Sequence, residues 1–164
     1  MKVKEMVLGA VLTSLALIIP LSFGGLLGVT IPPFSATLAS HVPSMLAMTI
    51  SPWVAFMVGA GSALGFLMKL GVVVGARASM HTIFATIGAI LIKKGYSFKK
   101  VLFFTAPIHA ITEALVVIPF GFSLYDMGVV IGVGTFLHHI VDSFIAIGIY
   151  SLIATTTGLM LISK

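Results

Sequence analysis

Apolar residues fill almost the whole chain, in runs separated by short polar or Gly- and Pro-containing stretches. A helix needs about 20 mostly apolar residues to cross about 30 Å of hydrocarbon. The 164 residues have room for six such helices, and the pattern places them at residues 6–21, 35–50, 53–70, 77–92, 99–120 and 138–161. The sequence therefore predicts an all-α integral membrane protein, a compact bundle of six transmembrane helices in a single domain covering residues 1–164.

Glycine and proline interrupt this pattern in three places. Residues 22–33 form a Gly/Pro-interrupted stretch before the second predicted helix, which is itself short and broken by Pro43. Ser51 precedes Pro52, and because a residue before proline avoids the helical region, this dipeptide predicts a tight turn. Residues 121–137 are rich in glycine and are compatible with a loop followed by a partly inserted helix.

The composition also favours lipid as the solvent. Hydrophobic residues make up 59% of the chain and charged residues only 8%, whereas soluble domains carry about 25% charged residues. This balance excludes most soluble enzymes and nucleic-acid-binding modules. The absence of cysteine excludes disulfides, thiolate metal sites and cysteine nucleophiles. The sequence has no Walker-type phosphate-binding motif, so any ATP-driven work would need an ATPase on another chain.

The basic residues predict the orientation of the bundle. Cytoplasmic loops of membrane proteins carry an excess of lysine and arginine. With the N-terminus inside, seven of the nine basic residues fall on the cytoplasmic side, namely Lys2, Lys4, Lys93, Lys94, Lys99, Lys100 and Lys164. Only Lys69 and Arg77 then lie outside. We therefore expect a multi-pass protein of the cell membrane with both termini in the cytoplasm.

Ionisable residues inside the predicted helices are the candidate functional groups, because charge is costly in hydrocarbon. They are Arg77 and His81 in the fourth helix, His109 and Glu113 in the fifth, His138, His139 and Asp142 at the start of the sixth, and His41 in the second. All fall in the outer half of the predicted bundle. This asymmetry predicts a concave site open to the outside. The alternative is that the His–carboxylate pairs only connect helices through hydrogen bonds.

Two other chemistries fit the same residues. The spacings His109-x-x-x-Glu113 and His139-x-x-Asp142 suit metal ligands on a helix, which leaves a membrane metallohydrolase open. Glu113 or Asp142 would also serve an ion-coupled carrier. Against these, the chain has neither an H-E-x-x-H nor a G-x-S-x-G motif, and six short helices without an inverted repeat are few for a secondary transporter.

Small residues form two stripes along the predicted helices. The first helix carries Gly9, Ala10, Thr13 and Ser14, and the third carries Gly61-x-x-x-Gly65. Such stripes let helices approach closely. They indicate either packing inside the bundle or docking onto a partner membrane subunit.

Taken together, these features resemble an S component of an energy-coupling factor (ECF) vitamin transporter, the substrate-binding membrane subunit of that class. The resemblance covers essentially the whole chain and rests on six helices, the small-residue stripe and the long loop before the second helix. Four runs resemble the niacin-type S components more specifically: FSATLASHVP at 34–43, MLAMTISP at 45–52, RASMH at 77–81 and IHAITE at 108–113.

The resemblance implies partners and a division of labour. The family's Ala-x-x-x-Ala signature, which contacts the coupling subunit, corresponds to Ala10-x-x-x-Ser14 in the coupling helix, residues 6–21. The expected coupling-subunit contacts are therefore Gly9, Ala10, Thr13 and Ser14. The loop at about residues 22–34 would form a lid over the site. The chain would join one transmembrane coupling subunit and two ATPase subunits, which use the ATP. It would perform no chemistry on its ligand and would bind no metal or cofactor of its own.

Nicotinate is an anion, and Arg77 offers a two-pronged donor for its carboxylate. His81 would donate to the carboxylate or contact the ring nitrogen, and Glu113 and Asp142 would hold histidines in place. Phe34, Phe120, Phe122 and Tyr125 would supply a stacking face. The expected site residues are Arg77, His81, His109, Glu113, His139, Asp142, His41, Phe34 and Tyr125.

The charges leave the substrate open. The outer half carries two basic residues, Lys69 and Arg77, and three acidic ones, Glu113, Asp126 and Asp142. No net positive charge is therefore present there to attract an anion. If Arg77 pairs with Glu113 or Asp142, a neutral vitamin such as pyridoxine fits as well. A cationic ligand such as thiamine would use the free carboxylates.

Overall fold

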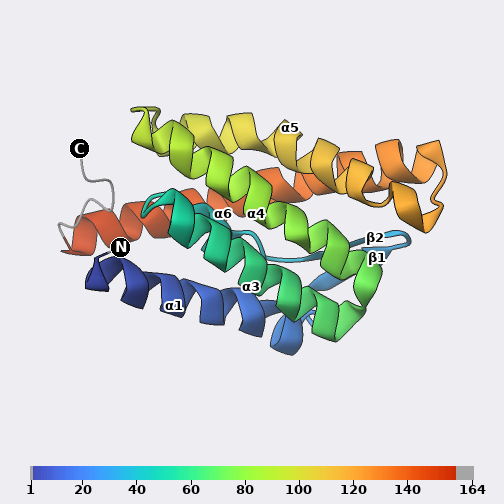
Figure 1. The fold of residues 1–164 in the computed structure, drawn as a ribbon, viewed down its shortest axis with the longest axis horizontal. Helices are drawn as coiled ribbons and strands as arrows, with labels where there is room; N and C mark the ends of the chain where they lie inside the picture. The colour runs from blue at the N-terminus through green and yellow to red at the C-terminus, as the bar shows by residue number, and fades with distance from the viewer. Residues whose placement is uncertain (1, 158–164) are drawn as a thin grey trace.

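The computed structural model describes residues 2–157 and is all-α, as predicted, apart from one small hairpin (Figure 1). Its six α-helices are α1 (Val3–Ile18), α2 (Val42–Ala47), α3 (Pro52–Leu70), α4 (Val72–Lys93), α5 (Phe98–Val116) and α6 (Gly134–Thr157). Five helical stretches in the described part of the chain are long and apolar enough to cross a membrane, at Val3–Phe23, Pro52–Leu70, Val72–Lys93, Phe98–Phe120 and Asp126–Thr156.

The predicted second transmembrane helix, residues 35–50, is wrong over its first half. Phe34–Thr37 forms strand β2, which pairs antiparallel with β1 (Gly28–Ile31). Only the six residues of α2 are helical, and Pro43 lies in its first turn, where a missing N–H costs nothing. Residues 35–50 by themselves favour an interrupted helix. Strand β1, whose pairing makes β2 a strand, lies outside that range, within the Gly/Pro-interrupted residues 22–33.

The chain still traverses the bundle between β2 and α3, but it does so inside the protein. Every residue from Ser40 to Thr49 is buried. Backbone that is not helical is tolerated at membrane depth where protein surrounds it, because its polar groups then avoid lipid. A short helix is therefore sufficient here, and α2 is not itself long enough to span.

The other predicted boundaries agree more closely. The third helix is confirmed, and the fourth begins at Val72, five residues earlier than predicted. A π-helical turn, Ile19–Phe23, extends α1, and a 3₁₀ turn, Ile118–Phe120, follows α5. The ambiguous stretch at 121–137 contains a π-helix, Asp126–Val133, that leads directly into α6. The predicted end of the sixth helix at residue 161 lies outside the described residues.

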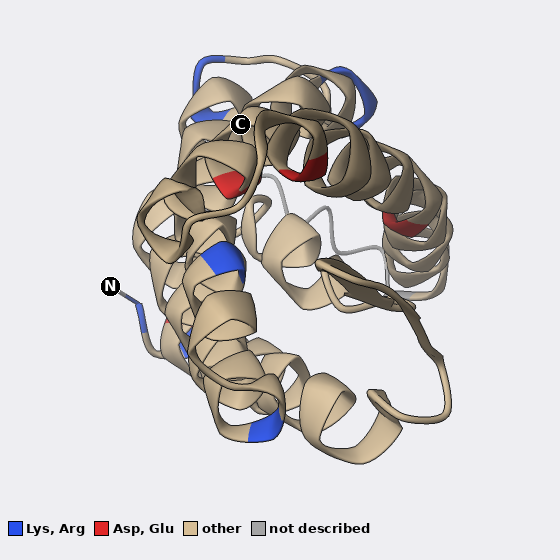
Figure 2. Cartoon of the chain, turned by 90° about the vertical axis from the view of Figure 1, so that its right-hand side faces the viewer, with Lys and Arg blue, Asp and Glu red and all other residues tan. Residues whose placement is uncertain are grey.

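The long helices run roughly side by side, with the hairpin at one end and the N-terminus at the other (Figure 1). The N-terminal end also holds the start of α3 and the α4–α5 loop, which share a surface pocket lined by Glu5, Ser51, Lys93 and Tyr96. Viewed from the hairpin end, the few charged positions are scattered over a largely uncharged ribbon (Figure 2). Large apolar side chains face outward, such as Phe103 and Phe144, as expected for helices that contact lipid.

Glycines let α3 pack closely against its neighbours. A Cβ on Gly59 would lie 2.6 Å from the backbone nitrogen of Thr82 in α4. A Cβ on Gly61 would lie 2.5 Å from Cγ2 of Thr13 in α1. The stripe on α3 therefore serves packing inside the bundle, one of the two roles the sequence allowed.

Candidate functional site

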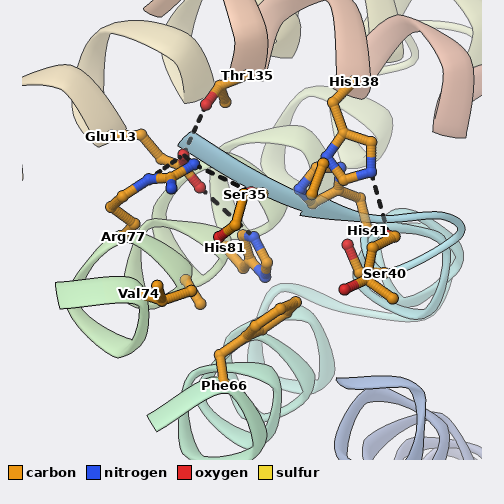
Figure 3. A pocket seen from close by; sticks show the side chains of 13 residues that line it. Ser35, Ser40, His41, Phe66, Val74, Arg77, His81, Glu113, Thr135 and His138 are labelled. Carbon is orange, nitrogen blue, oxygen red and sulfur yellow. Dashed lines mark hydrogen bonds and ion pairs between the residues drawn. The ribbon is translucent and has the colours of Figure 1, made fainter. Parts of the chain in front are cut away.

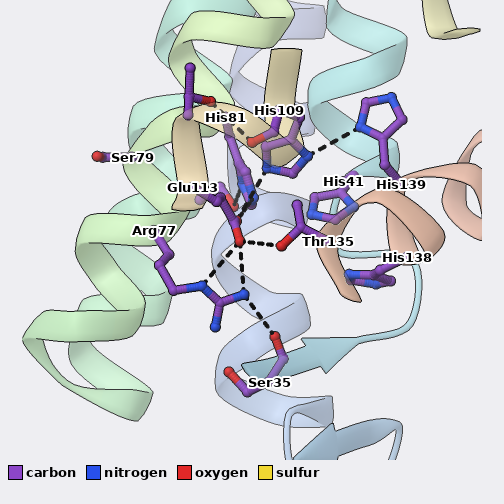
Figure 4. A network of polar contacts seen from close by, with 12 residues as sticks. Ser35, His41, Arg77, Ser79, His81, His109, Glu113, Thr135, His138 and His139 are labelled. Carbon is purple, nitrogen blue, oxygen red and sulfur yellow. Dashed lines mark hydrogen bonds and ion pairs between the residues drawn. The ribbon is translucent and has the colours of Figure 1, made fainter. Parts of the chain in front are cut away.

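Glu113 is the centre of a buried polar network between α4, α5 and α6 (Figure 4). Its Oε2 accepts hydrogen bonds from Nε of Arg77 at 3.0 Å, from Nη2 of Arg77 at 2.8 Å and from Oγ1 of Thr135 at 2.6 Å. Its Oε1 faces two imidazoles, with Nε2 of His109 at 3.2 Å and Nε2 of His81 at 3.9 Å. One carboxylate thus divides its oxygens between a guanidinium and a group of histidines.

Arg77 joins this network to the hairpin. Its Nη1 donates to the carbonyl of Pro33 at 3.3 Å and its Nη2 donates to the carbonyl of Ser35 at 3.4 Å. Its Cζ lies 5.3 Å from the ring centroid of Phe34, a cation–π geometry. The guanidinium is therefore enclosed by α5 on one side and by β2 on the other.

The deeper histidines have their own partners. Nδ1 of His81 lies 2.8 Å from Oγ of Ser62 on α3. Nδ1 of His109 lies 3.1 Å from Nδ1 of His139, and Nε2 of His139 lies 3.2 Å from the carbonyl of Leu102. All three histidines are buried, so these hydrogen-bond contacts hold each ring in one orientation.

Asp142 forms a second node on α6. Its carboxylate accepts the backbone N–H of Ala39 at 2.8 Å and that of His41 at 3.0 Å. Its Oδ2 also lies 3.1 Å from Nδ1 of His41 and 3.4 Å from Nε2 of His138. The same His138 nitrogen lies 3.2 Å from the carbonyl of Thr37 at the end of β2. Asp142 thereby ties the segment after the hairpin to α6.

His41 lies between the two nodes. Its ring centroid is 4.7 Å from those of His81 and His109 and 4.3 Å from that of His138. Three histidines, from α4, α5 and α6, therefore meet around His41 at the start of α2, and the ring of His139 lies 6.0 Å away. These histidines come from separate elements of the chain, so no short sequence motif predicts that their rings meet.

A small cavity opens between the network and the hairpin (Figure 3). Its volume is about 20 Å³, which is room for one water molecule. Arg77, Glu113, His81, His41, His138 and Phe66 are among its lining side chains. The buried hydroxyls of Ser35 and Ser40 also line it and have no hydrogen-bond partner within residues 2–157. Two unpaired hydroxyls beside a guanidinium are suited to bind a small polar ligand.

Strand β2 covers one side of this cavity, since Ser35, Ala36 and Thr37 line it. Two polar side chains beneath the hairpin contact its backbone. Arg77 contacts the carbonyls of Pro33 and Ser35, and His138 contacts the carbonyl of Thr37. A ligand larger than a water molecule would need these hairpin contacts to break before it could enter the cavity. The predicted lid, residues 22–34, includes β1 and the first residue of β2, and its role as a lid stays a prediction.

The structure brings most of the expected site residues together. Arg77, His81, Glu113 and His41 line the cavity, Phe34 contacts Arg77, and His109, His139 and Asp142 complete the network. Tyr125 does not join them, because it lies before the π-helix at the rim with 66% of its surface exposed. Phe120 is likewise exposed, at 38%.

The sequence patterns did not single out Ser35 and Ser40, whose hydroxyls line the cavity, nor three further residues of the site. Thr135 bonds Glu113, Ser62 bonds His81, and Phe66 lines the cavity. Ser62 and Phe66 are four residues apart and share one face of α3. That spacing was visible in the sequence, but a lone serine and phenylalanine in an apolar helix carry no signal by themselves.

Replacing Asp142 with alanine is expected to destabilise the closed hairpin by about 3 kcal/mol or more, because two buried backbone N–H groups lose their acceptor. The detergent-solubilised variant should show a lower melting temperature and faster protease cleavage within residues 24–33. Asp126→Ala, which removes a carboxylate bonded to the nearby Ser123, is the control and should change little. Equal protease resistance in the two variants would contradict the role of Asp142 as the hairpin's anchor.

Comparison with known proteins places the chain near one transporter. It is 34% identical over 165 aligned positions to the niacin transporter NiaX of Lactococcus lactis subsp. cremoris (strain MG1363), across 90% of this chain and 73% of that protein. No protein-family model matches the chain, and no solved structure matches it significantly.

Proposed function

The chain belongs to the family of the niacin transporter NiaX, and from this membership we propose that it is the S component of an ATP-driven ECF-type importer that captures niacin as nicotinate. It is a transporter subunit and not an enzyme. Arg77 carries the proposal for the ligand, since it is a buried guanidinium that lies directly beneath the hairpin.

The ligand's carboxylate would take the place of the hairpin carbonyls on Arg77. The two bonds from Arg77 to Glu113 measure 2.8 and 3.0 Å, while those to Pro33 and Ser35 measure 3.3 and 3.4 Å. The longer contacts, whose acceptors are neutral carbonyls, are the weaker ones. A carboxylate that replaces them makes two bonds in which both partners are charged, and Glu113 continues to orient the guanidinium from the other side.

The rest of the cavity supplies the faces for a pyridine ring. Phe66 lines it, His81 presents an imidazole edge, and Phe34 lies next to it against Arg77. The Ser35 and Ser40 hydroxyls offer donors for the ring nitrogen, which accepts. Because about 20 Å³ cannot hold a pyridine ring, we expect the hairpin to move outward on binding and to close over the ligand again.

We also propose that both termini face the cytoplasm and that α1 docks on the coupling subunit. The lysine-rich α4–α5 loop lies at the same end as the N-terminus, which supports this orientation. On α1, Gly9 packs against Val54, while Ala10 and Ser14 are exposed. The Ser14 hydroxyl donates to the carbonyl of Ala10 at 2.9 Å, so its hydrogen is already bonded within the helix. The exposed side chains on this face are therefore small, and their one hydroxyl donor is satisfied. One coupling subunit and two ATPase subunits would complete the importer.

Titration calorimetry on detergent-purified protein tests the proposal, with nicotinate, nicotinamide, pyridoxine and thiamine as ligands. We expect one-to-one binding of nicotinate and exclusion of nicotinamide, which lacks the carboxylate. Binding of pyridoxine or thiamine instead would preserve the S-component role and reject niacin. Accumulation of substrate by the chain alone in proteoliposomes, driven by an ion gradient, would reject the S-component role.

A further inference from the structure

We propose that His41, His81, His109 and Glu113 form a binding site for one divalent transition metal of the zinc class. Each offers one ligand atom, and these four atoms lie within 4.8 Å of one another; His41, His81 and Glu113 also line the cavity. All four residues are buried. This site goes beyond nicotinate capture and differs from the expectation that the chain binds no metal.

The spacing of the ligand atoms is close to what a metal needs. Tetrahedral bonds of 2.0–2.1 Å place ligand atoms about 3.3–3.4 Å apart. Nε2 of His109 is already 3.2 Å from Oε1 of Glu113, and Nε2 of His81 is 3.9 Å from the same oxygen. Small side-chain rotations would therefore close the site around an ion (Figure 4).

The hydrogen-bond pattern leaves the lone pair of His109 Nε2 without a donor, and a cation would satisfy it. Nε2 of His139 faces the carbonyl of Leu102, so in a neutral ring it carries the proton and Nδ1 accepts. Nδ1 of His109 must then donate to Nδ1 of His139. A neutral His109 consequently directs the lone pair of Nε2 at Oε1 of Glu113, two acceptors 3.2 Å apart. This nitrogen has no hydrogen-bond partner in the described part of the chain.

Two of the three imidazoles, those of His81 and His109, are also held from behind by hydrogen bonds, as metal-bound histidines usually are, and that of His41 is held by an ion-pair contact. Nδ1 of His81 lies 2.8 Å from Oγ of Ser62, and Nδ1 of His109 contacts His139. Nδ1 of His41 lies 3.1 Å from the Asp142 carboxylate. These outer contacts leave the three Nε2 atoms for the ion. Oε2 of Glu113 is occupied by Arg77 and Thr135, which leaves Oε1 for the same purpose.

The donor set indicates the class of metal. Three imidazoles and one carboxylate oxygen suit Zn²⁺ and its spectroscopic substitute Co²⁺, whereas Mg²⁺ and Ca²⁺ prefer all-oxygen sites. A second group, His41, His138 and Asp142, also lies within ligand distance. Its carboxylate already accepts two backbone N–H groups, so it is less free to bind an ion.

Titration with Co²⁺ tests this site in the full chain, purified in detergent without a histidine tag and treated with chelator. We expect one Co²⁺ per chain, with the intense visible absorption of a tetrahedral site, and displacement by Zn²⁺. His81→Gln should weaken binding by about 100-fold or more, and Ser62→Ala by about 10-fold, as loss of an outer contact does. His138→Gln is the matched control, because it removes a histidine of the second group, and it should retain binding.

Three results would overturn the proposal: folded wild-type protein that binds no Co²⁺, His81→Gln protein that binds as tightly as wild type, or loss of binding in His138→Gln alone. The first would mean that a proton on His109 satisfies Glu113, and the last would move the ion to the second group. Elution volume and melting temperature in detergent establish that each variant is folded. Nicotinate calorimetry on the same samples is a separate readout, so failure of the metal site and failure of niacin capture are distinguishable.

Discussion

Replacing Arg77 with alanine is expected to lower nicotinate affinity by about 10²–10⁴-fold, as measured by titration calorimetry. The variant loses two charge-assisted hydrogen bonds to the ligand carboxylate, each worth about 1.5–3 kcal/mol. Arg77→Lys should recover only part of the loss, because an ammonium group cannot make the paired contact of a guanidinium. Lys69→Ala removes an exposed positive charge from the end of α3 and should leave affinity unchanged.

The Arg77→Ala variant leaves Glu113 without its main partner in a buried setting, which costs about 3–5 kcal/mol of stability. A double variant, Arg77→Met with Glu113→Gln, removes the pair together and keeps the side-chain volume. It should remain folded and should still fail to bind nicotinate. Retained affinity in either folded variant would show that the carboxylate is held elsewhere.

Replacing Ala10 with tryptophan is expected to abolish uptake while leaving nicotinate binding intact. Ala10 is exposed on α1, so a large ring there adds bulk to the proposed docking face without entering the core. Close helix approach depends on small residues, and an indole would hold the coupling helix off its partner. Uptake of labelled nicotinate by cells that supply the coupling module measures the effect, and calorimetry on the purified variant measures binding.

Ile111→Trp is the matched control for this experiment. Ile111 lies on α5 with 58% of its surface exposed, so a tryptophan there also enlarges a surface helix. It should support normal uptake. Normal uptake with Ala10→Trp, or equal loss with both variants, would remove this face of α1 from the coupling surface.

The two predicted defects separate capture from delivery. Arg77 lies beneath the hairpin, at the opposite end of the molecule from the N-terminus. Ala10 lies on the outer surface of α1 and contributes no atom to the cavity lining. One variant should therefore fail in binding and the other only in transport, a pattern that a stand-alone carrier would not show.

The sequence by itself determined the class of protein, most of the helices and most of the residues that meet in the buried polar network. Hydropathy and length are local properties, so they predict the five long apolar helices, and charge within an apolar helix marks His109 and Glu113 wherever the helices pack. The helical spacing of four residues likewise places Arg77 and His81 on one face before any fold is known.

Only the tertiary structure decided how those elements meet. The strand β2 forms because Gly28–Ile31 pairs with it, and that pairing overrides the helical pattern of residues 35–50. Arg77 pairs with Glu113, 36 positions away, while Asp142 binds the backbone after the hairpin instead. Contacts between segments distant in the chain depend on the packing of whole helices. Local periodicity therefore predicts which residues face inward, and the packed bundle decides which of them touch.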